Sequence, residues 1–416
     1  PTSSVKILPW YLEGKMRNAS NRGVFESPVH TLQKPSVQIS ADKLKSACVR
    51  DTLFLVDYSA HYKTGATFFW TITPSPSYIS SRSVENPKVV FGSAGSYTVS
   101  LVVSDSLGTD SQTINAFYSV TEGCNIDPIP GSALQISADG QRALTAPLNI
   151  TSNTVTITAW VKPSQIQSDY SGIVMNFASV SSAGGLNVRQ NNELGYHWPG
   201  GSWWWSSGLT LTPGEWAHVA LVITPTSATI YKNGVGRTHT IALSPCEFRE
   251  LAIGSYRDWT SRTFKGLIDE VCFYNRSLNQ AEIRESMHLT KSGIYANNLI
   301  AYYQFNENEG FVQDKMGIDH ASLVAGAARS SSSVPVAGGV SDRLTINSSN
   351  ATTFPNTQVT MKFSSTGTNP NGEIVVSRLN YQPDVVPNSQ DSMSRYYWVI
   401  NNFGSNASFS PMQELW

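Results

Sequence analysis

The chain has 416 residues, of which only 14% are charged, and its formal net charge is −1 at pH 7. Average globular proteins carry about 25% charged residues. No run or stripe of Lys and Arg marks a nucleic-acid binder, and no apolar run reaches the roughly 18 residues that a membrane span requires. The length favours two to four domains, and the 11% aromatic content with abundant Ser, Thr, Asn and Gly favours β-sheet with many turns.

Residues 1–33 show no clear periodicity, and we interpret them as a leader or as the tail of a preceding domain. The chain begins at Pro1, without a methionine or a signal peptide. This start favours a mature or clipped piece of a longer precursor.

Residues 34–122 consist of short runs in which apolar and polar residues alternate, separated by turn residues. This pattern is typical of a β-sandwich of about 90 residues. The segments Phe69–Ile72, Asn86–Phe91 and Ala94–Leu101 resemble the polycystic-kidney-disease (PKD) domain, an immunoglobulin-like module. The Asp- and Gly-rich turn that this family usually has after its Trp is replaced by Thr71–Ser75. The resemblance implies an immunoglobulin-like domain.

Residues 132–326 carry four strand motifs in a fixed order, at Thr154–Pro163, Gly214–Val222, Ala228–Gly234 and Phe264–Leu278. The third motif ends in an Asn-Gly pair, which favours a tight hairpin turn. Taken in order, the motifs resemble the laminin-G-like (concanavalin A-like) jelly roll. The resemblance implies an extracellular module that recognises a ligand.

Residues 340–416 contain further short β runs and resemble the small β-sandwiches that follow laminin-G-like modules in large secreted proteins of Bacteroidota. The last run continues to Trp416, which favours a truncated or clipped domain. We therefore expect an all-β protein of serial β-sandwiches: an immunoglobulin-like module, a laminin-G-like jelly roll and a C-terminal β-sandwich. A source in Bacteroidota would imply the type IX secretion machinery as an export partner.

The four cysteines, Cys48, Cys124, Cys246 and Cys272, are widely spaced and form no C-x-x-C pair. An even set in a β-rich chain favours two disulfides and an oxidising compartment, although four buried thiols are the alternative. In an immunoglobulin-like sandwich, part of the first strand runs parallel to the last, which favours a Cys48–Cys124 bridge. Cys246 precedes the predicted strand Leu251–Tyr256, and Cys272 lies in the strand expected to return beside it. This arrangement favours a Cys246–Cys272 bridge.

The sequence predicts a non-catalytic chain. It has neither a G-x-S-x-G nor an H-E-x-x-H motif, and its seven histidines are scattered. Asp269 and Glu270 are adjacent, so on a strand they point to opposite faces and cannot flank one glycosidic bond. An enzyme domain elsewhere in a longer precursor stays open.

The jelly-roll resemblance implies a Ca²⁺ site with Asp139 and Asp269 as ligands, because related modules gather carboxylate oxygens at these places. The alternative is a structural role for both acids. Asp139 would then form an Asx turn, and Asp269 would be a surface charge or a hydrogen-bonded support.

The segment from residue 196 to residue 205 is rich in aromatic residues: Tyr196, Trp198, Trp203, Trp204 and Trp205. Three successive Trp residues cannot all face inward on a strand, so at least one is expected to be exposed. Exposed aromatic faces stack on sugar rings or on apolar groups of a partner. These five residues are therefore the candidate ligand site, with packing in the framework as the alternative.

Together these patterns predict an extracellular or cell-surface binding protein that recognises a glycan or a surface protein through the jelly roll. Two alternatives stay open. The chain could be the accessory, non-catalytic region of a large secreted peptidase or glycosidase, or it could be a structural adhesin stalk.

Overall fold

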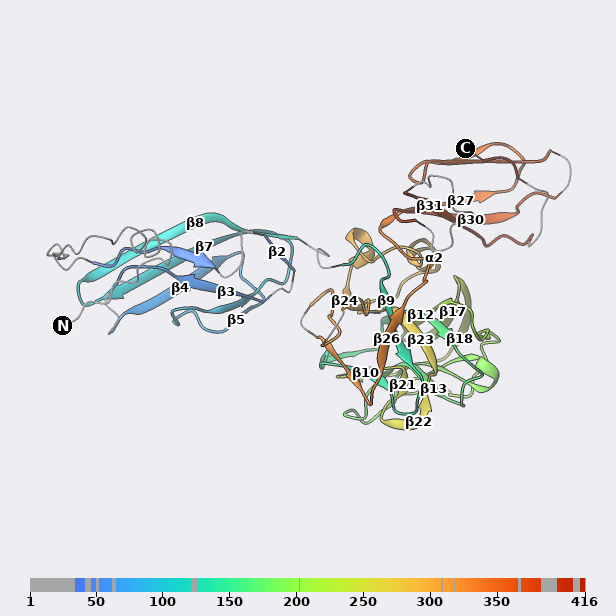
Figure 1. Ribbon diagram of the computed structural model, residues 1–416, viewed down its shortest axis with the longest axis horizontal. Helices are drawn as coiled ribbons and strands as arrows, with labels where there is room; N and C mark the ends of the chain where they lie inside the picture. The colour runs from blue at the N-terminus through green and yellow to red at the C-terminus, as the bar shows by residue number, and fades with distance from the viewer. Residues whose placement is uncertain are drawn as a thin grey trace, which may run out of the picture. The chain divides into compact units, whose positions relative to one another are not determined.

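A computed structural model of the chain (Figure 1) shows two compact units, Pro1–Cys124 and Asn125–Trp416. The predicted leader, residues 1–33, lies outside the described residues. The structure describes residues 34–41, 46–49, 52–61, 65–121, 126–201, 203–307, 310–317, 319–365, 368–382, 395–406 and 412–415.

The first unit is built from two four-stranded sheets. One has the order β1 (Ile39–Ala41), β3 (Thr52–Asp57), β6 (Lys88–Val90), β5 (Tyr78–Ile79); the other has the order β2 (Ser46–Cys48), β8 (Gly108–Thr121), β7 (Gly95–Asp105), β4 (Thr67–Thr73). β2 runs parallel to β8, with Cys48 opposite Thr121. This is the parallel pairing expected for an immunoglobulin-like sandwich. Cys124 lies outside the described residues, so the Cys48–Cys124 bridge stays a prediction.

The core of this unit follows the alternation of its strands. In β7 the side chains of Tyr97, Val99, Leu101 and Val103 are buried, while the residues between them are partly exposed. They pack around Trp70, whose indole Nε1 donates a hydrogen bond of 3.0 Å to the carbonyl of Val84.

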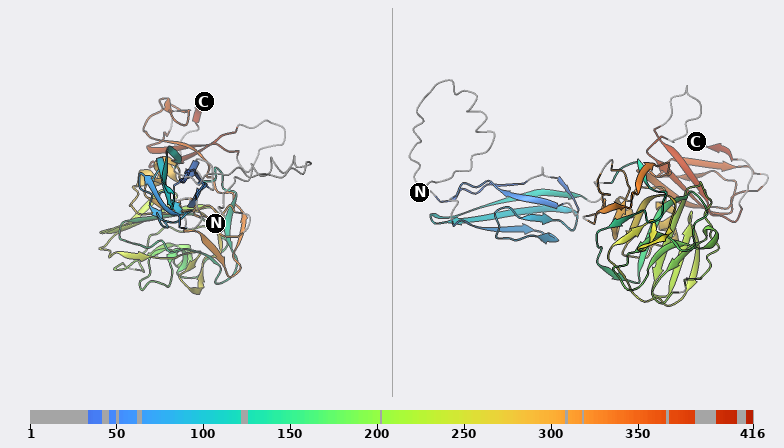
Figure 2. Two further views of the ribbon diagram at one scale, coloured as in Figure 1. Left: turned by 90° about the vertical axis from the view of Figure 1, so that its left-hand side faces the viewer. Right: turned by 60° about the horizontal axis from the view of Figure 1, so that its bottom comes forward.

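The second unit contains a jelly roll of two large antiparallel sheets, whose strands can be followed in Figure 2. The first sheet has the order β15 (Leu194–His197), β14 (Gly185–Val188), β13 (Ser171–Asn176), β20 (Leu251–Ile253), β10 (Arg142–Thr145), β25 (Ala321–Val324), and β13 also pairs with β22 (Trp259–Thr263), which pairs with β21 (Ser255–Tyr256). The second has the order β18 (Val235–Thr240), β17 (Ser227–Lys232), β16 (Ala217–Thr224), β12 (Val155–Pro163), β23 (Gly266–Tyr274), β9 (Ser132–Ile136), β26 (Ala328–Ser331), with β24 (Leu299–Tyr303) also on β23. The strands β11 (Ile150–Ser152) and β19 (Cys246–Phe248) form a separate two-stranded sheet of the jelly roll.

The main core lies between these two sheets. Ile157 and Leu221 from the second sheet and Val174 and Ile253 from the first are fully buried in it. The strand β16 is buried on both faces because a second apolar cluster, which includes Ala220 and Val222, covers its other side. That cluster includes Ile283 of helix α2 (Gln280–Ser286). Asn279 caps the start of the helix and forms a capping box with Glu282.

The C-terminal part of the second unit forms two three-stranded sheets around its own core. Their orders are β27 (Gly339–Ile346), β30 (Gly372–Leu379), β31 (Tyr397–Asn402) and β28 (Thr352–Phe354), β29 (Val359–Phe363), β32 (Met412–Leu415). Arg284 of α2 forms an ion pair of 2.7 Å with Glu373, which also pairs with Arg343 at 2.9 Å. Serial β-sandwiches, as predicted, make up the described chain. No helix in that part of the chain is both long and apolar enough to cross a membrane.

The predicted Cys246–Cys272 bridge is wrong, because both cysteines are free and buried. The Cys246 side chain lies in the core between the sheets, whereas the Cys272 side chain belongs to the cluster on the other face of the second sheet. Burial raises the pKa of both thiols to about 12. The residues around Cys272 explain its direction: its neighbours Val271 and Phe273 face the core, so Cys272 faces away.

Candidate functional site: an aromatic rim and a polar cavity

The predicted ligand segment begins on the edge strand β15, where successive side chains point to opposite faces of the sheet. Tyr196 points into the main core and is 1% exposed. Its hydroxyl lies 2.9 Å from Nδ1 of His239. Trp198 is also mostly buried, and its indole Nε1 donates a hydrogen bond of 2.8 Å to the carbonyl of Ser244. Tyr196 is therefore a framework residue, as the alternative interpretation expected.

Trp203 and Trp204 are the exposed members of the segment, with 46% and 64% of their surface accessible. They lie in a turn, and their ring centroids are 5.3 Å apart. Trp205 is partly buried and stacks on His239 at 5.0 Å. The prediction that at least one of the three is exposed is confirmed. The expected alternation of sides is wrong because the backbone turns at Trp203 instead of running extended.

A cavity of about 300 Å³ opens beside Trp203. Its lining residues are Ser182, Ala183, His197, Trp198, Pro199, Gly201, Trp203 and Tyr256. His197 follows Tyr196 on β15, so its side chain lies on the opposite face of the strand and points away from the core. Its Nδ1 lies 2.6 Å from the hydroxyl of Tyr256.

The other ring nitrogen of His197, Nε2, is buried and has no hydrogen-bond partner among the described residues. Burial, followed by the positive charges of Arg262 and Arg189, lowers the pKa of His197 from 6.5 to about 4. The imidazole is therefore neutral at physiological pH, with one nitrogen that donates and one that accepts a hydrogen bond. An unpaired buried polar atom is costly, but Nε2 has almost no accessible surface, so a ligand in the cavity would pair with it only after a neighbouring side chain moves.

Further aromatic rings surround Arg262. Its guanidinium lies 4.2 Å from the ring centroid of Trp259, 4.9 Å from that of Tyr256 and 5.1 Å from that of Tyr170. Tyr170 stacks on Trp203 at 5.9 Å, and Trp259 is 52% exposed. We call Tyr170, Trp203, Trp204 and Trp259 the aromatic rim.

Sequence reasoning missed His197, Tyr170, Tyr256, Trp259 and Arg262 as site residues. Only the sheet brings them together. Tyr170 directly precedes β13, and β13 pairs with β22, the strand that contains Trp259 and Arg262. The Arg262 side chain then stacks on Tyr256 and Trp259, which are close to it in the sequence, and on Tyr170, which comes from a distant segment. Alternation within one segment carries no signal for such a contact.

The structure does not bring Asp139 and Asp269, the predicted Ca²⁺ ligands, together, because they lie at opposite ends of one strand pair. Ile268 stands opposite Leu134 in the antiparallel pair of β23 and β9. Asp269 therefore lies beside the beginning of β9, whereas Asp139 follows its end. Asp139 is exposed and forms an ion pair of 3.0 Å with Lys265. Whether other oxygens of the chain bind Ca²⁺ stays a prediction.

Asp269 and Glu270 have structural partners in the interior. A β-bulge occurs where they pair with β12, and Glu270 has a φ of 51°. Ser332 donates a hydrogen bond of 2.5 Å to Asp269, while Glu270 accepts hydrogen bonds from Tyr302 and, at 3.0 Å, from Gln304. Burial and the neighbouring Glu270 raise the pKa of Asp269 well above its ordinary range. These contacts fit the hydrogen-bonded support that was the alternative for Asp269.

Comparison with known proteins shows that part of the chain matches a protein family. Residues 137–284 match the Laminin_G_3 model, described as the concanavalin A-like lectin/glucanases superfamily. No curated protein matches the chain.

Among solved structures, a proposed carbohydrate-binding protein of Bacteroides ovatus is 16% identical, with a TM-score of 0.40, over 73% of this chain and 95% of that one. Domain 4 of an extracellular arabinanase from Geobacillus stearothermophilus, in complex with arabinotriose, is 21% identical, with a TM-score of 0.29, over 36% and 73%. A heptameric SAP-like pentraxin from Limulus polyphemus is 15% identical, with a TM-score of 0.35, over 49% and 96%.

The family match covers most strands of both sheets, most of their shared core and the aromatic segment, whereas β9, β24, β25 and β26 lie outside it. The strand order and the matched residues agree with the resemblance drawn from the four motifs. Residues 137–284 therefore carry a concanavalin A-like jelly-roll domain of the Laminin_G_3 type.

Proposed function

We propose that the chain is a secreted or cell-surface protein that binds a glycan at the cavity of His197 and at the aromatic rim beside it. The observation that carries the proposal is the buried, unpaired Nε2 of His197 in a cavity that opens next to exposed indole rings. A sugar ring offers both complementary surfaces: C–H groups that pack on Trp203 and hydroxyls that can donate to or accept from a ring nitrogen of His197.

The size and composition of the cavity support a small polar ligand. Its volume of about 300 Å³ lies at the lower end of the range for small-molecule sites. The rim extends the apolar contact beyond the cavity through Trp204 and Trp259. A ligand longer than one sugar unit would therefore place one ring in the cavity and stack the next ring on the rim.

Binding without hydrolysis is part of the proposal. Glycosidases commonly use two carboxyl groups that flank the scissile bond. None of the described residues that line the cavity is Asp or Glu, and the pair Asp269 and Glu270 is buried against structural partners. The family description includes both lectins and glucanases, and the lining residues favour the lectin-like role.

A glycan array probed with the full chain tests the proposal. Trp203→Ala and Trp204→Ala should each weaken the signal, because they remove exposed stacking surface and no core contact. Phe69→Ala is the matched control, since Phe69 is 53% exposed on the first unit, outside the site. Equal binding by all three variants would contradict the assigned surface. An array on which the unaltered chain binds no glycan would contradict the function and favour the structural stalk.

A further inference from the structure

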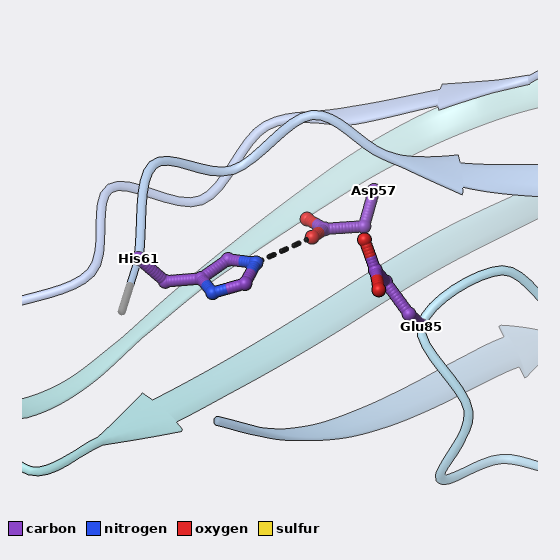
Figure 3. Close-up of side chains that lie close together, drawn as sticks. All are labelled: Asp57, His61 and Glu85. Carbon is purple, nitrogen blue, oxygen red and sulfur yellow. Dashed lines mark hydrogen bonds and ion pairs between the residues drawn. The ribbon is translucent and has the colours of Figure 1, made fainter. Parts of the chain in front are cut away.

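A second cluster of polar side chains lies in the first unit, independent of the glycan site. Asp57 is the last residue of β3, His61 follows it by four residues, and Glu85 lies in the connection between β5 and β6. Figure 3 shows the imidazole of His61 directed at the carboxylate of Asp57, with the carboxylate of Glu85 beside it. The three potential ligand atoms all lie within 4.8 Å of one another. No other group of three or more His, Cys, Asp or Glu side chains in the described part of the chain is this close.

Hydrogen bonds of the surrounding backbone hold Asp57 in place. The amide of Ser59 donates to Oδ1 of Asp57 at 2.9 Å, which leaves Oδ2 directed toward His61. The amide of Asp57 donates to the side chain of Asn86 at 2.9 Å, so the segment that carries Glu85 is tied to the end of β3. The amide of Leu55 adds a bond of 3.0 Å to the carbonyl of Pro87.

The imidazole of His61 is held equally well. The backbone of Ala60 exchanges two hydrogen bonds with Ser36, of 2.9 and 3.0 Å. The ring itself packs edge-on against Phe68, with ring centroids 5.3 Å apart. A site whose ligands are already oriented loses little conformational entropy when it binds an ion.

The spacing of the donors fits a small divalent cation. Nε2 of His61 and Oδ2 of Asp57 are 3.0 Å apart, and the exposed fractions of these side chains are 4% and 0%. In a tetrahedral zinc site with bonds of about 2.1 Å, neighbouring ligand atoms stand about 3.4 Å apart. Asp57 and His61 therefore need only a small displacement, the ion replaces the proton of the hydrogen bond between them, and the flexible side chain of Glu85 supplies the third ligand.

The chemistry of the donors selects the class of ion. Carboxylates alone would suit Ca²⁺ or Mg²⁺, whereas an imidazole nitrogen favours Zn²⁺ and its neighbours in the transition series. We infer that Asp57, His61 and Glu85 bind one divalent transition-metal ion, with Zn²⁺ as the representative. The ion would clamp the connection between β5 and β6 to the end of β3, a structural role.

Isothermal titration of the full chain with ZnCl₂, after dialysis against EDTA and removal of the chelator, tests this inference. We expect one Zn²⁺ per chain and a rise in the melting temperature when zinc is added. Glu85→Gln keeps the shape of the side chain but removes its charge, and should weaken zinc binding at least about tenfold. Glu215→Gln makes the same charge change at an exposed residue of the jelly roll and should leave the affinity unchanged.

X-ray absorption at the zinc edge supplies a readout that does not depend on a variant. The inferred site predicts a first shell of nitrogen and oxygen with one imidazole and no sulfur. Absence of stoichiometric binding, an unchanged affinity in Glu85→Gln, or a sulfur ligand would each overturn the inference.

Discussion

Acid should destabilise the jelly roll through His197. Burial and nearby positive charge lower the pKa of this residue from 6.5 to about 4 in the folded protein. Above pH 6.5 the imidazole is neutral in the folded and the unfolded chain, so it contributes no pH dependence. Between pH 6.5 and about 4 the unfolded chain takes up a proton that the folded chain does not, and the free energy of unfolding falls.

The size of the loss follows from the two pKa values. Each unit of difference corresponds to about 1.4 kcal/mol, so the drop from 6.5 to about 4 corresponds to about 3 kcal/mol once the pH is below 4. Other buried groups act at the same time. His288, with its pKa also lowered to about 4 by burial, adds to the loss. The raised pKa of Asp269 opposes it, because that carboxyl takes up its proton more readily when folded.

The variant His197→Gln separates this contribution from the others, because His288 and Asp269 titrate in both proteins. Urea unfolding between pH 7 and pH 4 can be followed by tryptophan fluorescence, since seven of the 11 Trp residues belong to residues 132–326. The unaltered chain should lose about 3 kcal/mol more than the variant across this range. A difference between the two proteins that does not change with pH would refute the reasoning.

Two further predictions concern the interior of the jelly roll. Cys246 and Cys272 are free and buried, so both should resist alkylation in the native protein and react after denaturation without reductant; a peptide map that joins them would contradict this. Gly254 has a φ of 95°, and an added Cβ would lie 2.0 Å from Cδ1 of Ile136. Gly254→Ala should therefore lower the free energy of unfolding by roughly 1–3 kcal/mol, and more than Gly208→Ala, where no atom lies within 4 Å of an added Cβ. Equal effects of the two substitutions in urea unfolding would count against this packing argument.

Much of the fold was accessible from the sequence because strand alternation is a local signal. The buried residues of β7 are separated by one residue each, as the period of a half-buried strand requires. The strands β12, β16 and β23 coincide with three of the four jelly-roll motifs. The Asn-Gly pair at residues 233 and 234 lies, as predicted, at the turn between β17 and β18.

The pairing of Cys246 with Cys272 and the juxtaposition of Asp139 with Asp269 could not be predicted correctly, because both depend on positions across the sheets. Cys246, on β19, faces the core between the two large sheets, whereas Cys272 faces the other side of the second sheet. The order of the strands in the sequence does not reveal this difference. Asp139 and Asp269 belong to neighbouring strand segments, but the register places them at opposite ends. The inference of an oxidising compartment from disulfides now depends on Cys48 and Cys124 alone.

The candidate site was predicted in part. The run of three Trp residues indicated exposed aromatic surface, and Trp203 and Trp204 provide it. Their turn was missed because the run was taken as extended. The cavity of His197 was not predictable, since Ser182, Ala183 and Tyr256, which come from other segments of the chain, complete its lining. Such contacts arise only when the first sheet has formed.

The most direct test of glycan binding at the aromatic rim is the NMR spectrum of the indole N–H groups. The chain has 11 Trp residues, and single Trp→Phe variants assign their signals. Titration with a glycan that binds on the array should shift the signals of Trp203 and Trp204, and Trp198 to a smaller extent, while Trp70 stays unchanged. Shifts confined to Trp residues outside the rim, or no shift of Trp203 and Trp204 at saturation, would contradict the proposed site.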